Sequence, residues 1–253
     1  MKSISKSFFK LATVAVFFGM SFSSLASTQN DSAASSRPSF LAPLPQVPQA
    51  VKQAIIDNSD QLAFDPQSPT IGRADAPVTV VEFFDYQCMY CHKAFPLYEE
   101  YVKTHPNIRF VFKEFPFFGP VSRYAALVSL DAYKTGGQKL FAKYHNAQFT
   151  AKNSEGKGYT DMLRTDKLTI EKVNDIAKSV GIEVKSKSDL EKYAGEIKRN
   201  FKLASKISVR GTPTFIVLPT PLSGKQIKTD QISLIPGAVP MAYINQAVAK
   251  AKQ

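Results

Sequence analysis

The chain has 253 residues, of which 44% are hydrophobic, with two cysteines and a formal net charge of +11 at pH 7. This length allows one sizeable core and at most two domains. The lysines are scattered among acidic residues without a platform of basic and aromatic side chains, which indicates solvated helix faces and argues against a nucleic-acid binder.

The N-terminal segment, 1–26, has the features of a cleavable signal peptide. Three lysines in the first ten residues precede a short apolar stretch at 11–20, and Ser24 and Ala26 are small residues at the positions that a signal peptidase recognises. The apolar stretch is shorter than the roughly 20 residues of a membrane-spanning helix. We therefore expect export and cleavage after Ala26, with an uncleaved membrane anchor as the alternative.

The next segment, 27–47, is rich in serine, alanine and proline, so we expect a flexible leader. A helix is predicted from about residue 48 to residue 63, because apolar residues from Val51 to Leu62 fall on one of its faces. With its connector this helix makes up 48–74. Docking onto its own domain is the simplest role for the apolar face, and a dimer contact is the alternative.

The segment 75–120 has the order strand, helix, strand. Residues 78–84 are β-branched, aromatic and almost continuously apolar, as expected of a central strand buried on both faces. A helix with Pro96 near its start follows the two cysteines, and residues 108–115 repeat the strand pattern. The pattern predicts a βαβ unit with both cysteines at the N-terminus of its helix.

The segment 121–208 shows helical periodicity without a convincing strand, which predicts a helical insertion. Strand patterns return in 209–253, at 212–219 and 231–237, where polar turn residues between them indicate a hairpin. A last helix is predicted at 240–250. The order of elements predicts an α/β fold with an inserted helical domain.

Cys88 and Cys91 are separated by two residues, a spacing found in structural disulfides, zinc sites and redox-active pairs. A disulfide that closes so short a loop contributes only about 2 kcal/mol to stability. Zinc would need further ligands from His92, His105 and His145, which include no second pair at ligand spacing. The redox-active pair is therefore the favoured interpretation, and no metal is expected.

The predicted position of Cys88 at the start of a helix favours this interpretation. Unpaired N–H groups and the positive end of the helix dipole stabilise a thiolate there. Cys91 lies one turn further on the same side and could attack a mixed disulfide formed at Cys88. We therefore predict Cys88 as the nucleophile and Cys91 as the resolving cysteine.

Pro213 directly precedes the strand pattern that begins in 212–219. A trans proline there would be an ordinary residue of an edge strand. A cis bond between Thr212 and Pro213 would instead bring a free backbone edge beside the sulfur of Cys88. We expect Thr212 to pair there with an extended peptide substrate.

The stretch EFFDYQCMYC, followed about 120 residues later by GTPTF with a helical segment between, closely resembles the DsbA-like thiol:disulfide interchange proteins of the bacterial periplasm. The resemblance covers about residues 69–252. It implies a thioredoxin fold with an inserted helical domain, a catalytic Cys-x-x-Cys and a cis bond before Pro213. It implies no cofactor other than the redox-active disulfide between Cys88 and Cys91.

In this family a buried glutamate assists proton transfer at the second cysteine, and it corresponds to Glu82, with a nearby lysine corresponding to Lys113. The surroundings of Glu82 agree, because an ionised carboxylate in an apolar strand is costly unless it is paired. We expect either a raised pKa at Glu82 or an ion pair with Lys113. A group of this kind suits a proton acceptor for Cys91, and purely structural pairing at the strand end is the alternative.

The sequence departs from the best-known DsbA pattern at Met89 and Tyr90, which replace Pro-His and remove a donor that could favour the Cys88 thiolate. Together with Thr212, these two residues are expected to contact the substrate. Thr212 is familiar from the isomerase branch and from many DsbA-like oxidases. We expect His92 to be a solvated helix residue that supports the site at most indirectly.

These features predict a periplasmic dithiol oxidase that introduces disulfides into unfolded exported proteins with free thiols. A membrane partner that reoxidises it is implied by the resemblance. A disulfide isomerase or reductase is one alternative, and a non-catalytic surface protein with a thioredoxin fold is another. A monomer is favoured over a dimer, because only about 50 residues lie between Ala26 and the predicted fold.

Overall fold

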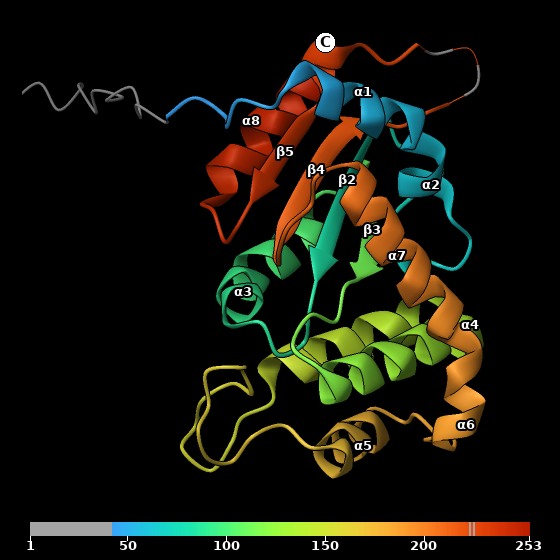
Figure 1. Ribbon diagram of the computed structural model, residues 1–253, viewed down its shortest axis with the longest axis vertical. Coiled ribbons are helices and arrows are strands. Elements are labelled where there is room, and N and C mark those ends of the chain that lie inside the picture. The colour runs from blue at the N-terminus through green and yellow to red at the C-terminus, as the bar shows by residue number, and fades with distance from the viewer. Residues whose placement is uncertain (1–41, 223, 225) are drawn as a thin grey trace, which may run out of the picture. The chain divides into compact units, whose positions relative to one another are not determined.

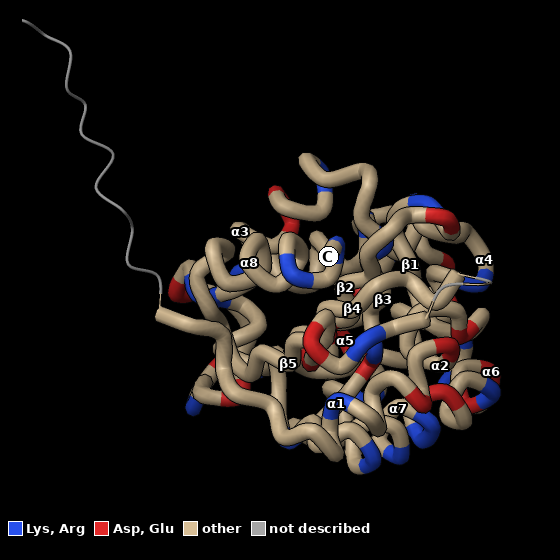
Figure 2. The backbone as a smooth tube through the Cα atoms, turned by 90° about the horizontal axis from the view of Figure 1, so that it is seen from above, with Lys and Arg blue, Asp and Glu red and all other residues tan. Residues whose placement is uncertain are grey.

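The computed structural model describes residues 42–222, 224 and 226–253 (Figure 1). The predicted signal peptide, 1–26, and the predicted leader as far as residue 41 lie outside the described residues. Within the described ranges, no helix is both long enough and apolar enough to cross a membrane. Figure 2 shows that Lys and Arg are interspersed with Asp and Glu along this part of the chain.

The elements follow the predicted order, with short additions. In chain order they are α1 Gln49–Asp57, α2 Ser59–Phe64, β1 Thr70–Ile71, β2 Val78–Phe84, α3 Met89–Thr104, β3 Ile108–Glu114, α4 Pro120–Thr150, α5 Ile170–Ser179, α6 Lys187–Leu190, α7 Ala194–Lys206, β4 Thr214–Pro219, β5 Ser233–Pro236 and α8 Met241–Ala251. The predicted first helix is two helices, because the chain turns at Asn58, whose side chain donates to the carbonyl of Ala54. The two-residue strand β1 was too short to predict from a sequence pattern.

The sheet has five strands in the order β1-β3-β2-β4-β5. Strands β2 and β3 are parallel, as a βαβ unit requires, and the other neighbouring pairs are antiparallel. All seven residues of β2 are buried, as its continuous apolar sequence predicts. The predicted hairpin is formed by β4 and β5, and the arrangement is the thioredoxin fold with inserted helices.

The two faces of the sheet carry different cores, because successive side chains of a strand point to opposite faces. Val78, Val80 and Phe84 pack with residues of α3, α4 and α8. Val81 and Phe83 pack with residues of α1, α2 and α7. Figure 1 shows α3 and α8 on one side of the sheet and α2 and α7 on the other.

The segment predicted as a helical insertion contains α4 to α7. Helix α4 is interrupted at Gly137, whose φ of 62° lies outside the helical region, so it consists of two arms. Helix α7 packs against the sheet through Leu203 and Ala204, although the prediction placed it in the insertion. The inserted helices proper are therefore α4, α5 and α6, joined by a long loop between α4 and α5.

Candidate active site

Cys88 is the N-cap of α3 and is almost fully buried, with 2% of its surface exposed. Its thiol donates a hydrogen bond to the carbonyl oxygen of Thr212, with 3.2 Å between Sγ and O. Hydrogen bonds with the side chains of Cys91 and Thr212 and with the backbone amides of Cys91 and Tyr90 outweigh the opposing effect of burial and lower the pKa of Cys88 to about 7. Cys88 is therefore poised to ionise near neutral pH, as its helix-start position predicts.

Cys91 lies one turn into α3 and is 1% exposed. Burial raises the pKa of the Cys91 thiol well above its ordinary value, and the neighbouring Cys88 and Glu82 raise it further. Both cysteines are free thiols in this structure. The pair is asymmetric, because Cys88 can carry the thiolate at a pH where Cys91 keeps its proton.

Glu82 lies on β2 on the same face of the sheet as the cysteine helix. It is 4% exposed, and no hydrogen-bond partner of its carboxyl group is found among the described residues, 42–222, 224 and 226–253. Burial, followed by repulsion from Cys88, raises the pKa of Glu82 to about 8. Of the two expectations for this residue, these surroundings agree with the raised pKa.

The alternative expectation, an ion pair between Glu82 and Lys113, is not met. Lys113 follows the β3 residue that lies opposite Glu82, so its side chain points to the other face of the sheet. There its ammonium group donates to the carbonyl of Gln61 at 2.9 Å and to Ser68 Oγ at 2.7 Å, and lies 3.5 Å from a carboxylate oxygen of Asp65. Lys113 thus belongs to the opposite core and has no contact with the cysteines.

The peptide bond between Thr212 and Pro213 is cis, as predicted. The bond directly precedes β4, and Gly237 after β5 donates to the Pro213 carbonyl at 2.7 Å, which holds this loop against the end of the hairpin. A cavity of about 360 Å³ opens beside it and is lined by residues of the same loop and of β5. The loop therefore forms a wall of the site, with the Thr212 carbonyl against Cys88.

Met89 and Tyr90 occupy the first turn of α3, next to Cys88. Tyr90 is 53% exposed, and the ammonium group of Lys93 lies 5.2 Å from the centre of its ring. Met89 is half-buried and lines a second cavity of about 550 Å³ along α3. Both side chains are placed where a molecule approaching Cys88 would meet them.

His92 is not the solvated residue that was expected. Its Nε2 donates to the carbonyl oxygen of Tyr86 at 2.8 Å, and its ring lies 5.0 Å from the ring of Phe149. Burial lowers the pKa of His92. The helical pattern placed His92 on the outer side of α3, but the loop between α4 and α5 folds over this side and covers it.

Asp85 is a residue that the sequence reasoning missed. Its carboxylate accepts hydrogen bonds from the Gln87 amide, from the amides of Phe117 and Phe118, and from the hydroxyl of Ser122. Burial raises the pKa of Asp85, whereas these four hydrogen bonds lower it. Asp85 fixes the turn between β2 and Cys88, and a local signal existed, because aspartate commonly accepts from the amide two residues on.

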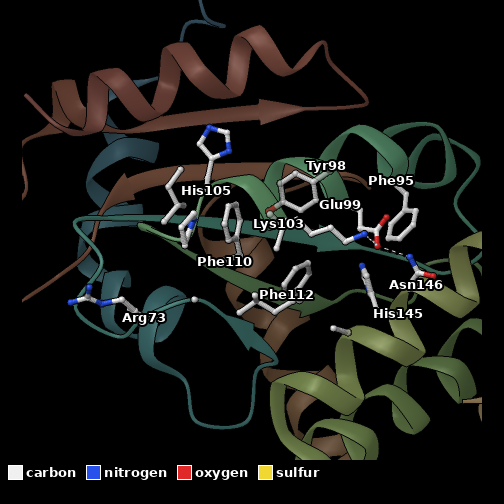
Figure 3. Close-up of a pocket in the computed structure, with 16 residues that line it drawn as sticks. Arg73, Phe95, Tyr98, Glu99, Lys103, His105, Phe110, Phe112, His145 and Asn146 are labelled. Atoms are coloured by element: carbon white, nitrogen blue, oxygen red, sulfur yellow. Dashed lines mark hydrogen bonds and ion pairs between the residues drawn. The ribbon is translucent and has the colours of Figure 1, made fainter. Parts of the chain in front are cut away.

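An apolar cavity of about 450 Å³ runs along α3 on the Glu82 side of the sheet. Phe110 and Phe112 from β3, His145 from α4 and Tyr98 from α3 line it, as Figure 3 shows. The rings of Tyr98 and Phe112 lie 6.3 Å apart, and those of Tyr98 and Phe215 lie 4.9 Å apart. These two phenylalanines flank Glu82 on the neighbouring strands, so Tyr98 covers Glu82.

Comparison with known proteins gives a consistent result. Residues 65–229 match the family model described as Thioredoxin. Disulfide bond formation protein D of Bacillus subtilis is 30% identical over 158 residues, which are 59% of this chain and 67% of that protein. Two Na(+)/H(+) antiporters from Salinispora species match over only 18% and 21% of their own length.

Solved structures add to this result. BcfH from Salmonella enterica Typhimurium superimposes with a TM-score of 0.63 and 30% identity, covering 81% of this chain and 82% of that one. Proteus mirabilis ScsC in a transitional conformation gives a TM-score of 0.61 and 25% identity, with 80% of each chain covered. The similarity therefore includes most of the residues that the structure describes.

Proposed function

The chain belongs to the Thioredoxin family and is a thiol:disulfide oxidoreductase of the DsbA type, and we propose that it is a periplasmic dithiol oxidase acting through Cys88 and Cys91. The observation that supports this proposal most directly is the asymmetry of the pair. Cys88 has a pKa of about 7 and contacts the Thr212 carbonyl, whereas Cys91 is buried and keeps its proton.

The first chemical step starts from the disulfide between Cys88 and Cys91. A substrate thiolate attacks Cys88 Sγ, the bond between the two cysteines breaks, and its electron pair leaves on Cys91. Because the Glu82 carboxyl has a pKa of about 8, it is largely protonated at neutral pH and can give its proton to the Cys91 thiolate. The product is a mixed disulfide between Cys88 and the substrate.

The second step releases the substrate. A second substrate thiolate attacks the substrate sulfur of the mixed disulfide, and Cys88 leaves as a thiolate. The low pKa of Cys88 makes it a good leaving group. In total the substrate loses two electrons and two protons and gains a disulfide, while the Cys88 and Cys91 pair is reduced.

Reoxidation runs through the same groups in reverse. The Cys88 thiolate attacks a disulfide of a membrane partner, and Glu82, once ionised, takes the proton from Cys91 so that Cys91 can attack Cys88 Sγ. The family relationship supports such a partner in general terms. We propose unfolded exported proteins as the substrates, bound along the Thr212 backbone and against Met89 and Tyr90.

Trapping tests the roles of the two cysteines. Incubating Cys91→Ala with a peptide disulfide should accumulate a mixed disulfide at Cys88, detected as a mass increase, because no resolving thiol remains. Cys88→Ala is the matched control and should accumulate none. If both variants accumulate adducts equally, the assignment of Cys88 as the nucleophile is wrong.

The reduction potential tests the direction of the reaction. Equilibration with glutathione measures it, and for a two-electron couple about 30 mV corresponds to about 1.4 kcal/mol. An oxidase requires a potential near the oxidising end of the thioredoxin superfamily. A potential near that of thioredoxin would replace the proposed oxidase with a reductase or isomerase.

A further inference from the structure

The loop between α4 and α5 reaches the start of the cysteine helix through Asp161. The Asp161 amide donates to the carbonyl of Gln87 at 2.6 Å, and the Asp161 carboxylate accepts from the Met89 amide at 3.1 Å. Met89 is the first residue of α3, directly after Cys88. An exposed carboxylate from the inserted segment thus occupies the same helix N-terminus as the nucleophilic sulfur.

Two negative groups share this helix start when Cys88 ionises. The sulfur of Cys88 is stabilised by the amides of Tyr90 and Cys91, and the remaining amide of the first turn, that of Met89, is bound to Asp161. A carboxylate there repels the thiolate and takes up part of the positive end of the helix dipole. Asp161 therefore acts against the groups that stabilise the Cys88 thiolate.

We propose that Asp161 is a positioning residue that tunes the nucleophile, because its carboxylate disfavours the Cys88 thiolate and makes the protein a weaker oxidant. This inference rests on the proposed function, since the reduced state of an oxidase is stabilised by the same thiolate. It also gives the inserted segment a role in the chemistry, through a residue more than seventy positions from Cys88 in the sequence.

The loop is fixed at this position by its packing against His92. A Cβ atom added to Gly158 would lie 2.8 Å from Nδ1 of the His92 ring, so glycine permits the close approach. His92 is held in turn by its hydrogen bond to the Tyr86 carbonyl. The contact between Asp161 and Met89 is thus supported by a second contact between the same loop and α3.

Other titratable groups lie near Cys88 and are unchanged by a substitution at Asp161. They are Cys91 on α3, Glu82 on β2 and Asp85 in the turn before Cys88, and the loop that carries Thr212 also contains Arg210. Because they remain in place, a shift in the titration of Cys88 can be assigned to the Asp161 charge.

Asp161→Asn tests the proposal, because asparagine keeps an oxygen that can accept from Met89 but has no charge. Ultraviolet absorbance of the thiolate against pH should show a Cys88 pKa lower by about half a unit to one unit, which is about three- to tenfold more thiolate below the pKa. The reduction potential should become more oxidising. The difference should shrink at 1 M salt, where the Debye length is only about 3 Å.

Asp166→Asn is the matched control. Asp166 lies in the same loop, but its carboxylate accepts from the Ser154 amide at 2.6 Å, away from the cysteines. This variant should titrate like the wild type. An Asp161→Asn variant whose Cys88 pKa is unchanged or higher would overturn the proposal.

The two proposals fail in different ways. The thiolate titration needs no substrate, so it reports on Asp161 even if the wild type oxidises no peptide. A wild type without exchange activity would end the proposed function. An active wild type whose Asp161→Asn variant keeps the same pKa and the same potential would end only the inference about Asp161.

Discussion

Two buried ionisable residues on neighbouring strands, Glu82 and Lys113, lie on opposite faces of the sheet and differ in the polar contacts that surround them. Lys113 is fully buried, and its ammonium group contacts Gln61, Ser68 and Asp65. Glu82 is 4% exposed and has no hydrogen-bond partner among the residues that the structure describes. Both side chains are buried, but only Lys113 has polar neighbours that offset the cost of burying a charge.

The difference separates a structural charge from a chemical one. Burial lowers the pKa of Lys113, and the nearby carboxylates of Asp65 and Glu196 oppose this shift by favouring the charged form. For Glu82, burial and Cys88 act in the same direction and bring the pKa to about 8. An unpaired buried acid beside a reactive thiol therefore exchanges its proton near neutral pH, which suits proton transfer.

The largest change in stability is expected when Lys113, the buried charge with polar partners, is removed. Lys113→Ala should lower the free energy of unfolding by about 3–5 kcal/mol, because it removes the buried cation that contacts Gln61 and Ser68 and leaves Asp65 with Arg199 as its ion-pair partner, 4.0 Å away. Urea denaturation measures this loss. The Cys88 pKa should not change, since Lys113 lies on the other face, and a loss below about 1 kcal/mol would contradict the comparison.

A smaller change, this time a gain in stability, is expected when Glu82, the buried acid without a hydrogen-bond partner in the described part of the chain, is replaced. Because the folded-state pKa of Glu82 is raised from 4.5 to about 8, its protonated form favours folding, and stability is lost as the pH rises from about 4.5 to 8. Glu82→Gln removes this loss and should be more stable at pH 7 by up to roughly 3 kcal/mol. Urea denaturation at pH 5 and pH 7 should show the gain only at the higher pH.

His145 contributes a slope of opposite sign, which makes the difference between variant and wild type the informative quantity. Burial lowers the pKa of His145 from 6.5 to about 3, so its contribution to stability is present above about pH 6.5 and is lost as the pH falls toward 3. This slope is common to both proteins. A Glu82→Gln difference that does not vary with pH would show that Glu82 is ionised in the folded state throughout.

The same substitution should slow the steps at Cys91 by about 100-fold, the lower end of the range of roughly 100- to 10,000-fold for general acid–base catalysis. Stopped-flow measurement of mixed-disulfide resolution against pH would show the loss of the Glu82 titration. Glu114→Gln is the matched control, because Glu114 is another buried acid on this face and its burial raises its pKa well above the ordinary value. If Glu82→Gln and wild type have the same pH profile, the carboxyl is structural only.

The smallest effect is expected at the hydroxyl of Tyr98, which covers Glu82. This hydroxyl is buried and has no hydrogen-bond partner among the described residues, so Tyr98→Phe should stabilise the fold by up to about 1 kcal/mol. Tyr86→Phe should have the opposite sign, because the Tyr86 hydroxyl donates to Ser129 at 3.0 Å. Thermal unfolding compares the two, and a destabilised Tyr98→Phe would show that this hydroxyl is bound to Glu82 or to water.

The features that the sequence predicts well are those with local signals. The burial of β2 and the helix that starts after Cys88 are each encoded within about ten residues. The cis bond before Pro213 was instead expected from its combination with the distant Cys-x-x-Cys pair. The pairing of Glu82 with Lys113 failed because it depended on the register between β2 and β3. A shift of one residue places a side chain on the other face, and sequence periodicity does not fix the register between two strands.

The contacts that the inserted segment makes with α3 could not be predicted from local sequence patterns either, but for a different reason. His92 has the helical spacing of an exposed residue, and its cover comes from a loop that includes Gly158. Asp161 lies in a loop segment without regular structure, so no pattern connects it with Met89. Loop residues of this kind can be placed only when the three-dimensional path of the chain is known.

The hydrogen bond between Cys88 and Thr212 joins residues that are 124 positions apart. Translation proceeds at about 5–20 residues per second, so about 6–25 s pass between the synthesis of the nucleophile and that of the wall that covers it. Until then, a growing chain carries two uncovered thiols of its own. Under the proposed function, an exported nascent copy in this state would be a substrate for copies of the same protein that had already folded.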